Sequence, residues 1–336
     1  MNTSVIESGE KEFIRAQEVL LKLQDIVKQQ VLGRDNIIEL AIIALIADGH
    51  ILLEDFPGSG KTTLAKALGE AIESEQIAGE CTIPFRRIQF TPDLLPSDVT
   101  GVSIFDTKTE EFHFRNGPLF AYVILADEIN RTSPKVQSAM LEAMGEKQVT
   151  VDNTTYALDE LFFVIATQNP LDLVGTYPLP TPQLDRFLFK ITMSHIDREA
   201  ELQVLDSINE RKRLLSKQNK VNRDDILKAR KTINEQIKIS RTIKTTLVDI
   251  SRNLREDDRV LQGNSTRSMV LLLPALQVHA ALRGRNYVSS EDIEILIPEV
   301  LNHRIELVPG VNDFEKVLLE SMERPLEELA KSTLAK

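Results

Sequence analysis

The sequence is poor in cysteine, since only Cys81 among its 336 residues carries a thiol. A single cysteine excludes an internal disulfide and a cysteine metal cluster. No apolar run approaches the ~18 residues of a membrane-spanning helix, and the polar, acidic segment 1–12 lacks the pattern of a secretory signal. The five histidines show no ligand spacing. We therefore expect a cytoplasmic protein without a transmembrane segment.

The sequence also lacks an excess of basic residues. Its net charge is −11, and the acidic excess lies within residues 1–195. Because binding to nucleic acid needs a basic surface, we expect no nucleic-acid partner. One basic interval, 211–244, is either the solvated face of helices or a docking patch for an acidic partner or neighbouring subunit.

What the sequence does contain is a candidate phosphate-binding loop. An apolar run is followed by a glycine-bearing stretch at 54–63 and then by a helical pattern. In this context backbone N–H groups cradle phosphates, and the helix N-terminus adds a positive dipole. Lys61 would reach the β- and γ-phosphates of ATP, and Thr62 would place its hydroxyl on Mg²⁺. The predicted nucleotide contacts in this loop are Pro57, Gly58, Ser59, Gly60, Lys61, Thr62 and Thr63.

The loop departs from the strict motif at one position, where Asp55 replaces the first glycine. The amides nearest the phosphates come from Gly58 to Thr62, so this departure leaves the prediction intact. Upstream, two helical patterns meet at Val31 and Gly33, and these helices are either outer helices of the sheet or a cover over the adenine ring. We include Val31 and Gly33 among the predicted nucleotide contacts.

A second motif supplies the other half of a nucleotide site. The apolar run 122–126 ends in Asp127 and Glu128. Asp127 would hold Mg²⁺ through its waters, and Glu128 would activate the water that attacks the γ-phosphate. Asn169 follows the next apolar run and either orients that water or contacts the γ-phosphate, or else serves as a turn residue before Pro170.

The distribution of apolar runs predicts the architecture. Continuous runs are typical of a parallel sheet that helices cover on both faces, and they occur at 50–54, 86–90, 122–126, 161–166 and 187–191. Beyond residue 197 the patterns are helical. We predict an N-terminal helix at 1–30, an αβα core at 31–196 with hairpins near 102–114 and 147–158, and a helical domain at 197–336.

The order of these motifs resembles that of AAA+ ATPases and, more narrowly, the MoxR family. The resemblance extends from about Val31 to about Arg304 and is carried by the segments 125–131, 137–144, 166–170 and 184–187. It implies a P-loop AAA+ fold, with a three-layer αβα domain around a five-stranded parallel sheet and a small all-α lid. The two hairpins resemble the helix-2 insert and the pre-sensor hairpin of that clade.

The resemblance also implies roles for single residues. Asn169 matches the sensor-1 position, and Arg186 matches the arginine finger, which would act on the ATP of a neighbouring subunit. Arg267 matches sensor 2, although a surface arginine on a helix is the alternative. A guanidinium can neutralise charge on a phosphoryl group in transfer. Because a finger acting in trans requires an oligomer, we expect a hexameric ring by analogy.

The function implied by the resemblance is ATP-driven, chaperone-like remodelling or maturation of client proteins, often with partners that carry a von Willebrand factor A domain. The expected cofactors are ATP and Mg²⁺. Three alternatives remain: the ATPase subunit of a magnesium chelatase, a nucleic-acid motor, and a scaffold that binds ATP without turnover. The acidic charge disfavours the motor, while Glu128 and Arg186 argue against the scaffold.

Overall fold

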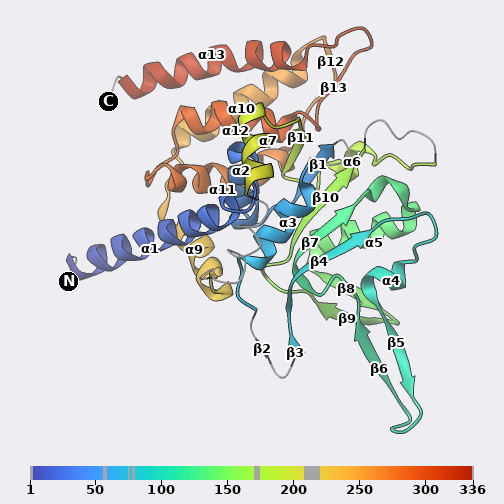
Figure 1. The fold of residues 1–336 in the computed structure, drawn as a ribbon. Coiled ribbons are helices and arrows are strands. Elements are labelled where there is room, and N and C mark those ends of the chain that lie inside the picture. The colour runs from blue at the N-terminus through green and yellow to red at the C-terminus, as the bar shows by residue number, and fades with distance from the viewer. Residues whose placement is uncertain are drawn as a thin grey trace.

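The structure is a computed structural model that describes residues 3–55, 59–74, 76–77, 80–169, 175–207 and 220–334. Pro57 and Gly58 of the predicted loop therefore lie outside the described residues, as does the part of the basic interval up to residue 219. Figure 1 shows a core of strands and helices, with a mainly helical domain beside it.

The core is built on a five-stranded sheet in which every neighbouring pair of strands is parallel. The strand order is β11-β1-β10-β7-β4. The strands are β1 (Ile51–Asp55), β4 (Ile83–Gln89), β7 (Ala121–Asp127), β10 (Phe163–Gln168) and β11 (Phe189–Met193). This confirms the predicted five-stranded parallel sheet.

Both faces of the sheet are covered, which explains why its strands are continuously apolar. Every residue of β7, an interior strand, is buried. In β10, Phe163 and Ile165 belong to one hydrophobic cluster, whereas Val164 and Ala166 belong to another on the opposite face. This alternation follows from successive side chains of a strand pointing to opposite faces.

Helices of the core form the two outer layers. One hydrophobic cluster joins the sheet to α2 (Asp35–Ile46) and α3 (Lys61–Glu70), and the other joins it to α5 (Pro134–Glu146). Helix α3 ends at Glu70, where the chain turns, and residue 72 bridges to residue 221. The short helical segments are α4 (Pro96–Thr100), η1 (Ile129–Arg131) and α6 (Thr181–Leu184).

Hairpins are present at both predicted places. The first pairs β5 (Gly101–Asp106) with β6 (Glu111–Asn116) and projects from the core (Figure 1). The second pairs β8 (Gln148–Val151) with β9 (Thr154–Ala157). A further short pair, β2 (Gln76–Ile77) with β3 (Glu80–Cys81), was not predicted because two-residue strands have no readable periodicity.

The second domain is helical apart from one short β-ribbon. Its helices are α7 (Arg198–Asp206), α9 (Arg223–Gln236), α10 (Arg241–Glu256), α11 (Thr266–Leu282), α12 (Ser290–Leu301) and α13 (Phe314–Leu334). The ribbon pairs β12 (Val260–Gln262) with β13 (Glu306–Leu307). Helix α13, which packs along α10, was missed by the sequence analysis.

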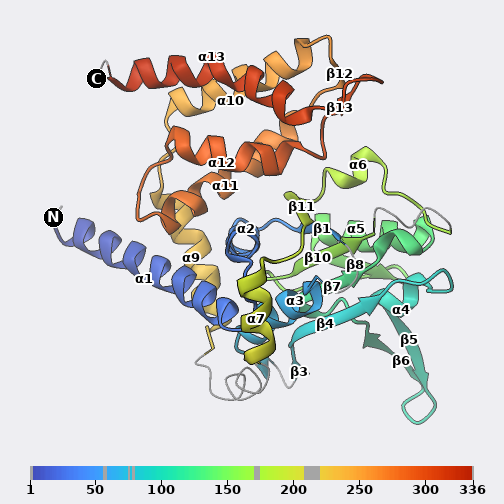
Figure 2. The same ribbon diagram turned by 45° about the horizontal axis from the view of Figure 1, so that its top comes forward.

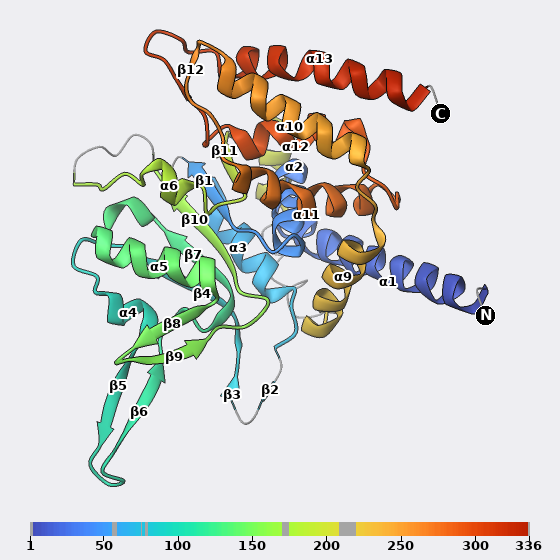
Figure 3. The same cartoon turned by 180° about the vertical axis from the view of Figure 1, so that it is seen from behind.

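The helical domain and the core share one hydrophobic cluster. It contains residues of α2 and α3 together with residues of α11 and α12. The N-terminal helix α1 (Thr3–Lys28) lies along α9, as Figures 1 and 2 show. Seen from behind in Figure 3, α12 and β11 approach each other where the two domains meet. None of the helices in the described ranges is long and apolar enough to cross a membrane.

Candidate active site

The described part of the phosphate loop leads directly into α3. Gly60 caps the helix with a φ of 94°, a left-handed conformation that glycine adopts without steric penalty. Lys61 is the first helical residue, so Lys61, Thr62 and Thr63 occupy the first turn. The N–H groups of that turn have no partner within the helix, which suits them to an anion.

The structure brings the loop and the end of β7 together. Lys61 Nζ lies 3.6 Å from Asp127 Oδ1. Thr167, on the neighbouring strand β10, donates its hydroxyl to the same Oδ1 at 2.7 Å. On the other side, Arg87 of β4 donates to Asp127 Oδ2 through Nη2 at 2.6 Å and Nε at 3.1 Å. Asp127 is therefore held by residues from three elements.

These partners keep Asp127 ionised. Burial alone would raise the pKa of its carboxyl group, because the side chain is only 4% exposed. Hydrogen bonds from Thr167 and Arg87 and the charges of Lys61 and Arg87 outweigh burial, so the pKa of Asp127 lies below its ordinary value. The site thus presents a carboxylate to a cation.

Glu128 leaves the strand with an unusual backbone. Its φ of 59° and ψ of 51° are left-handed, a conformation that costs a non-glycine residue about 1–3 kcal/mol and that clusters at functional sites. The turn is fixed because the Glu128 N–H donates to the Thr167 hydroxyl at 2.9 Å. The Glu128 carboxylate accepts a hydrogen bond from Gln89 Nε2 at 2.7 Å, and Arg131 Nε lies 3.5 Å away.

The residues present fit Mg²⁺. Over the described ranges, no group of three or more His, Cys, Asp or Glu side chains could hold a metal ion by itself. Mg²⁺ in nucleotide sites needs fewer protein ligands, because phosphates and waters complete its octahedron. Thr62 offers a hydroxyl beside Lys61, and Asp127 offers a carboxylate, so both are hard oxygen ligands of the required kind.

Asn169 directly follows β10 at the same edge of the sheet. Its neighbour Gln168 donates to Glu54 Oε1 at 2.6 Å, and Lys190 pairs with the same oxygen at 2.9 Å. The ends of β1, β10 and β11 are thereby tied together beside the loop. Asn169 thus stands at the carboxyl edge where Asp127 and Glu128 also lie, as parallel strands require.

Val31 and Gly33 lie where the chain passes from α1 to α2. Val31 is buried. Gly33 has a φ of 68°, and a Cβ at this position would lie 2.5 Å from the Cβ of Ala200. Arg34 fixes the same junction by donating to the Ser194 carbonyl at 2.8 Å. The junction that contains the predicted contact Gly33 therefore packs against residues 194–200, which connect β11 to α7.

The two predicted arginines come from elements other than those that form this cluster. Arg186 follows α6 and donates a hydrogen bond to the Leu141 carbonyl of α5. Arg267 is exposed in the first turn of α11. The described contacts of Arg186 thus do not include the Lys61–Asp127 pair of its own chain.

Three residues that hold the site were absent from the sequence-based site: Arg87, Gln89 and Thr167. Arg87 and Gln89 are two positions apart on β4 and therefore lie on the same face. Gln89 is in register with Asp127 of β7. Their role depends on β4 lying next to β7, a strand order that periodicity does not reveal. Thr167 lies within the motif 166–170, directly before the polar residues Gln168 and Asn169. Its position at the end of a predicted strand was the signal that could have marked it as a site residue.

Comparison with known proteins finds relatives of both domains. Residues 50–189 match the "ATPase family associated with various cellular activities (AAA)", and residues 252–324 match the "AAA lid domain". The uncharacterized protein YeaC of Bacillus subtilis is 42% identical over 308 residues, covering 92% of this chain and 93% of the relative. The chaperone MoxR1 of Mycobacterium tuberculosis is 35% identical over 84% of this chain and 74% of its own length.

A solved structure extends the likeness to three dimensions. The crystal structure of a proposed ATPase from Cytophaga hutchinsonii matches with a TM-score of 0.84 at 36% sequence identity. The match covers 95% of this chain and 98% of that one, so both the core and the helical domain are included.

Proposed function

The chain belongs to the MoxR family of AAA+ ATPases, and from this premise we propose that it hydrolyses ATP within a homo-oligomeric ring to remodel or mature client proteins. The observation that carries the proposal is the meeting of Lys61, Asp127 and Glu128 at one edge of the sheet. A cationic loop residue, an ionised carboxylate and a second, constrained carboxylate are the groups that phosphoryl transfer to water requires.

Each residue then has a distinct task. Lys61 and the N–H groups of the first turn of α3 bind phosphate oxygens. Thr62 and Asp127 hold Mg²⁺, which would neutralise charge on the phosphates when bound. Glu128 accepts a proton from the attacking water, and its left-handed backbone fixes the direction from which it does so. Asn169 orients that water or the γ-phosphate from the adjacent strand end.

Two arginines complete the proposed site from other elements. Arg267 would reach the nucleotide of its own subunit from the lid. Arg186 would act on the nucleotide of the neighbouring subunit, in keeping with its described hydrogen bond to α5 rather than to Lys61, Asp127 or Glu128. A site that borrows an arginine works only in an oligomer, and a hexamer is the family-based expectation.

The proposed clients are proteins, including partners with a von Willebrand factor A domain. Support comes from the projecting β5–β6 hairpin, where Phe105 and Phe112 are paired with ring centroids 5.1 Å apart. Both rings are exposed, Phe112 by 72% of its surface. Exposed apolar side chains of this kind mark sites of protein contact.

The direct test is the variant Glu128→Gln, which keeps shape and hydrogen bonding but removes the base. We expect ATP binding near the wild-type level, with hydrolysis reduced about 10²- to 10⁴-fold because general base catalysis is lost. Phosphate release and binding of a fluorescent ATP analogue measure the two quantities. Glu142→Gln, an exposed position on α5, is the matched control. Wild-type turnover by Glu128→Gln would overturn the assignment of the base.

Sharing of the site between subunits needs a separate test. Arg186→Ala should bind ATP but lose hydrolysis, and Asp127→Ala should also be inactive. Mixed assemblies of the two should regain part of the activity, because Arg186→Ala subunits keep an intact site that an Asp127→Ala neighbour can complete. Failure to regain activity, with mixed assembly shown by subunit exchange, would contradict action across the interface.

A further inference from the structure

The residue before the predicted finger is held by the lid. Asp185 directly precedes Arg186, and its Oδ1 accepts a hydrogen bond from Arg304 Nε at 2.7 Å. Arg304 also donates from Nη2 to the Asp185 carbonyl at 3.1 Å. Ser268, in the first turn of α11, donates its hydroxyl to the same carboxylate at 3.3 Å. Asp185 is therefore fixed from two separate parts of the lid.

Arg304 grips the whole segment that carries Arg186. The residue is only 2% exposed, so its charge depends on protein partners. Beyond Asp185, it donates to the carbonyls of Phe187 at 2.5 Å and Leu188 at 3.2 Å. Its Nη1 also donates to the Val300 carbonyl of α12, so the guanidinium joins the lid to this segment. A buried guanidinium held in this way resists displacement, because moving either partner leaves a charge unpaired.

The residues before Arg304 extend this grip. His303 Nε2 donates to the Phe187 carbonyl at 3.1 Å. Asn302 Nδ2 donates to the Lys190 carbonyl at 2.9 Å. Three consecutive lid residues thus bind the segment 185–190 largely through its backbone. We call Asn302, His303 and Arg304 the lid clamp.

The same contact also touches the lid element that would sense nucleotide. Ser268 directly follows Arg267, and both lie in the first turn of α11, whose cap is Ser265. Asp185 thus lies next to Arg186 along the core chain and beside the neighbour of Arg267 across the domain boundary. One carboxylate connects the arginine proposed for a subunit's own ATP with the arginine proposed for the next subunit's ATP.

We propose that Asp185 and Arg304 are positioning residues that make the lid and the arginine finger move as one body. Resting on the proposed function, this means that a lid shifted by its own nucleotide changes how Arg186 is presented to the neighbouring subunit. The nucleotide state of one subunit would then set the hydrolysis rate of the next. Because a displacement of about 1 Å can cost about 10²-fold in rate, a modest lid movement is sufficient.

A double-mutant cycle separates positioning from plain stability. We expect Asp185→Asn and Arg304→Lys each to lower kcat about tenfold or more, with the Kd for an ATP analogue unchanged. In the Arg186→Ala background, neither change should lower the residual rate further, because the group that they position is gone. A further loss of rate when either change is added to Arg186→Ala would overturn the proposal. Weaker nucleotide binding by either single variant would also overturn it.

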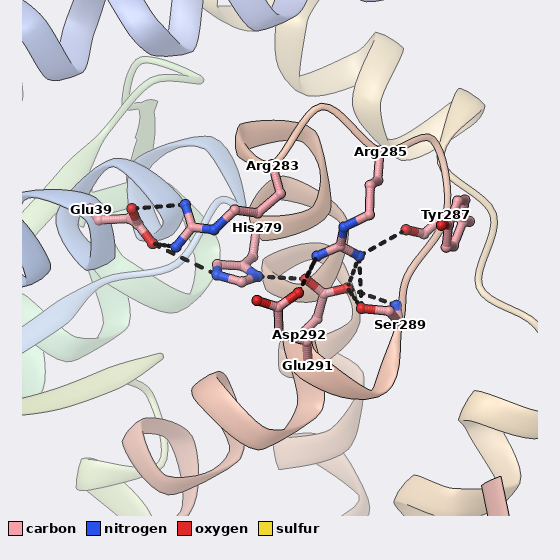
Figure 4. Close-up of polar contacts among 8 residues, drawn as sticks. All are labelled: Glu39, His279, Arg283, Arg285, Tyr287, Ser289, Glu291 and Asp292. Atoms are coloured by element: carbon pink, nitrogen blue, oxygen red, sulfur yellow. Dashed lines mark hydrogen bonds and ion pairs between the residues drawn. The ribbon is translucent and has the colours of Figure 1, made fainter. Parts of the chain in front are cut away.

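A matched control exists within the lid, drawn in Figure 4. Arg285 donates to both oxygens of the buried Asp292 at 2.8 Å. Like Arg304 it is an arginine paired with an aspartate, but its described partners lie within the lid. Arg285→Lys should therefore leave kcat near the wild-type value. A loss equal to that of Arg304→Lys would mean that any damage to the lid reduces hydrolysis, and would overturn the proposal.

Mixed rings test the direction of the effect. Arg304→Lys subunits should regain hydrolysis when their neighbours are Glu128→Gln subunits, which supply a well-placed Arg186 but no base. No recovery would overturn the proposal, because the defect would then lie in the subunit's own site. Normal hydrolysis by Arg186→Ala would overturn the trans finger together with this inference. Loss in Arg186→Ala alone, with Asp185→Asn and Arg304→Lys normal, would overturn this inference only.

Discussion

The two ends of the central sheet use charged residues in opposite ways. At the carboxyl end, Asp127 lies 3.6 Å from Lys61, which is longer than a hydrogen bond. Its second partner, Arg87, has a side chain that is half exposed. Contacts of this kind are open to exchange, because phosphate or a metal ion can take the place of either partner. These features support our proposal that this end of the sheet binds and releases a ligand.

At the amino end, the polar groups are paired with other residues of the protein. His50, directly before β1, is fully enclosed by protein: its Nε2 donates to the Met144 carbonyl at 3.1 Å, and its Nδ1 accepts from the Val164 N–H at 3.1 Å. Nearby, Asp48 Oδ1 lies 2.5 Å from the ammonium of Lys147 and 2.7 Å from the guanidinium of Arg230. His50 is thus buried among its partners, and Asp48, although partly exposed, is paired with two cations.

The amino end also ties the lid to the core. Arg223 and Arg230 both belong to α9, a lid helix. Arg223 Nε donates to both oxygens of Asp159 at 3.0 Å, and Arg230 donates to the Leu45 carbonyl at 2.8 Å. We therefore expect substitutions at the carboxyl end to reduce activity and substitutions at the amino end to reduce stability.

The largest expected effect is at Lys61. Lys61→Ala removes the cation that binds phosphate, so we expect hydrolysis to fall about 10³-fold, the loss typical of one preorganised charge in a reaction site. The melting temperature should stay near the wild-type value, because Asp127 keeps its hydrogen bonds from Thr167 and Arg87 when the 3.6 Å contact with Lys61 is lost. Phosphate release and thermal unfolding measure the two quantities. Lys66→Ala, one turn along α3, is the control, since Lys66 is half exposed.

A loss of activity without a loss of melting temperature in Lys61→Ala would support this difference between the two ends of the sheet. A drop in both activity and melting temperature would break it, because the carboxyl end would then contribute to stability as the amino end does.

The second prediction is acid lability caused by His50. Burial lowers its pKa to about 4, from about 6.5 in the unfolded chain. Below pH 6.5 the unfolded chain binds a proton that the folded protein does not bind, so stability falls as the pH drops and levels off below about 4. The free energy of unfolding should decrease by about 3 kcal/mol across this window. Urea unfolding at several pH values measures it.

The control variants separate His50 from other histidines. His50→Gln should show a smaller loss of stability between pH 6.5 and 4, whereas His113→Gln, on the exposed hairpin, should follow the wild type. His303 also contributes in this direction, because its burial lowers its pKa well below the ordinary value. Equal pH dependence in His50→Gln and wild type would contradict the prediction.

More of the carboxyl end of the sheet than of the amino end could be predicted from the sequence. Lys61, Asp127 and Glu128 could be predicted as site residues because each belongs to a short motif, in which the chemistry requires fixed spacing along the chain. The strands were found because burial on both faces makes them continuously apolar. The parallel sheet itself is confirmed, although the sequence could not give the strand order β11-β1-β10-β7-β4.

The amino-end contacts were not predicted because they join distant residues. Arg223 and Asp159 are 64 positions apart, and Arg230 and Leu45 are 185 apart. In the sequence, Arg223 and Arg230 were only two members of the basic interval 211–244. That interval was interpreted either as a solvated face or as a docking patch. In the described part of that interval, these two arginines bind the core, an arrangement that neither interpretation anticipated.

The third prediction concerns Arg223. Arg223→Gln leaves the carboxylate of Asp159 without its cation in a site where both side chains are mostly buried. We expect a loss of about 2 kcal/mol in the free energy of unfolding, the usual range for a charged hydrogen bond that is removed. Hydrolysis at a temperature well below the melting point should be unchanged. Arg252→Gln, whose pairing with Glu256 is exposed, should cost far less. Equal losses in the two variants would contradict the prediction.

The smallest expected effect returns to the carboxyl end, at Gln89. Gln89 Nε2 donates to Glu128 Oε2 at 2.7 Å, and the backbone of Glu128 is already fixed by Thr167. Gln89→Leu removes this hydrogen bond and leaves the carboxylate only its 3.5 Å contact with Arg131 among the described contacts, so we expect kcat to fall about tenfold with nucleotide binding and melting temperature unchanged. Gln262→Leu, exposed in the lid, is the control. A rise in kcat would mean that Gln89 restrains the base rather than aims it, and a drop in melting temperature would show that the carboxyl end also holds the fold together.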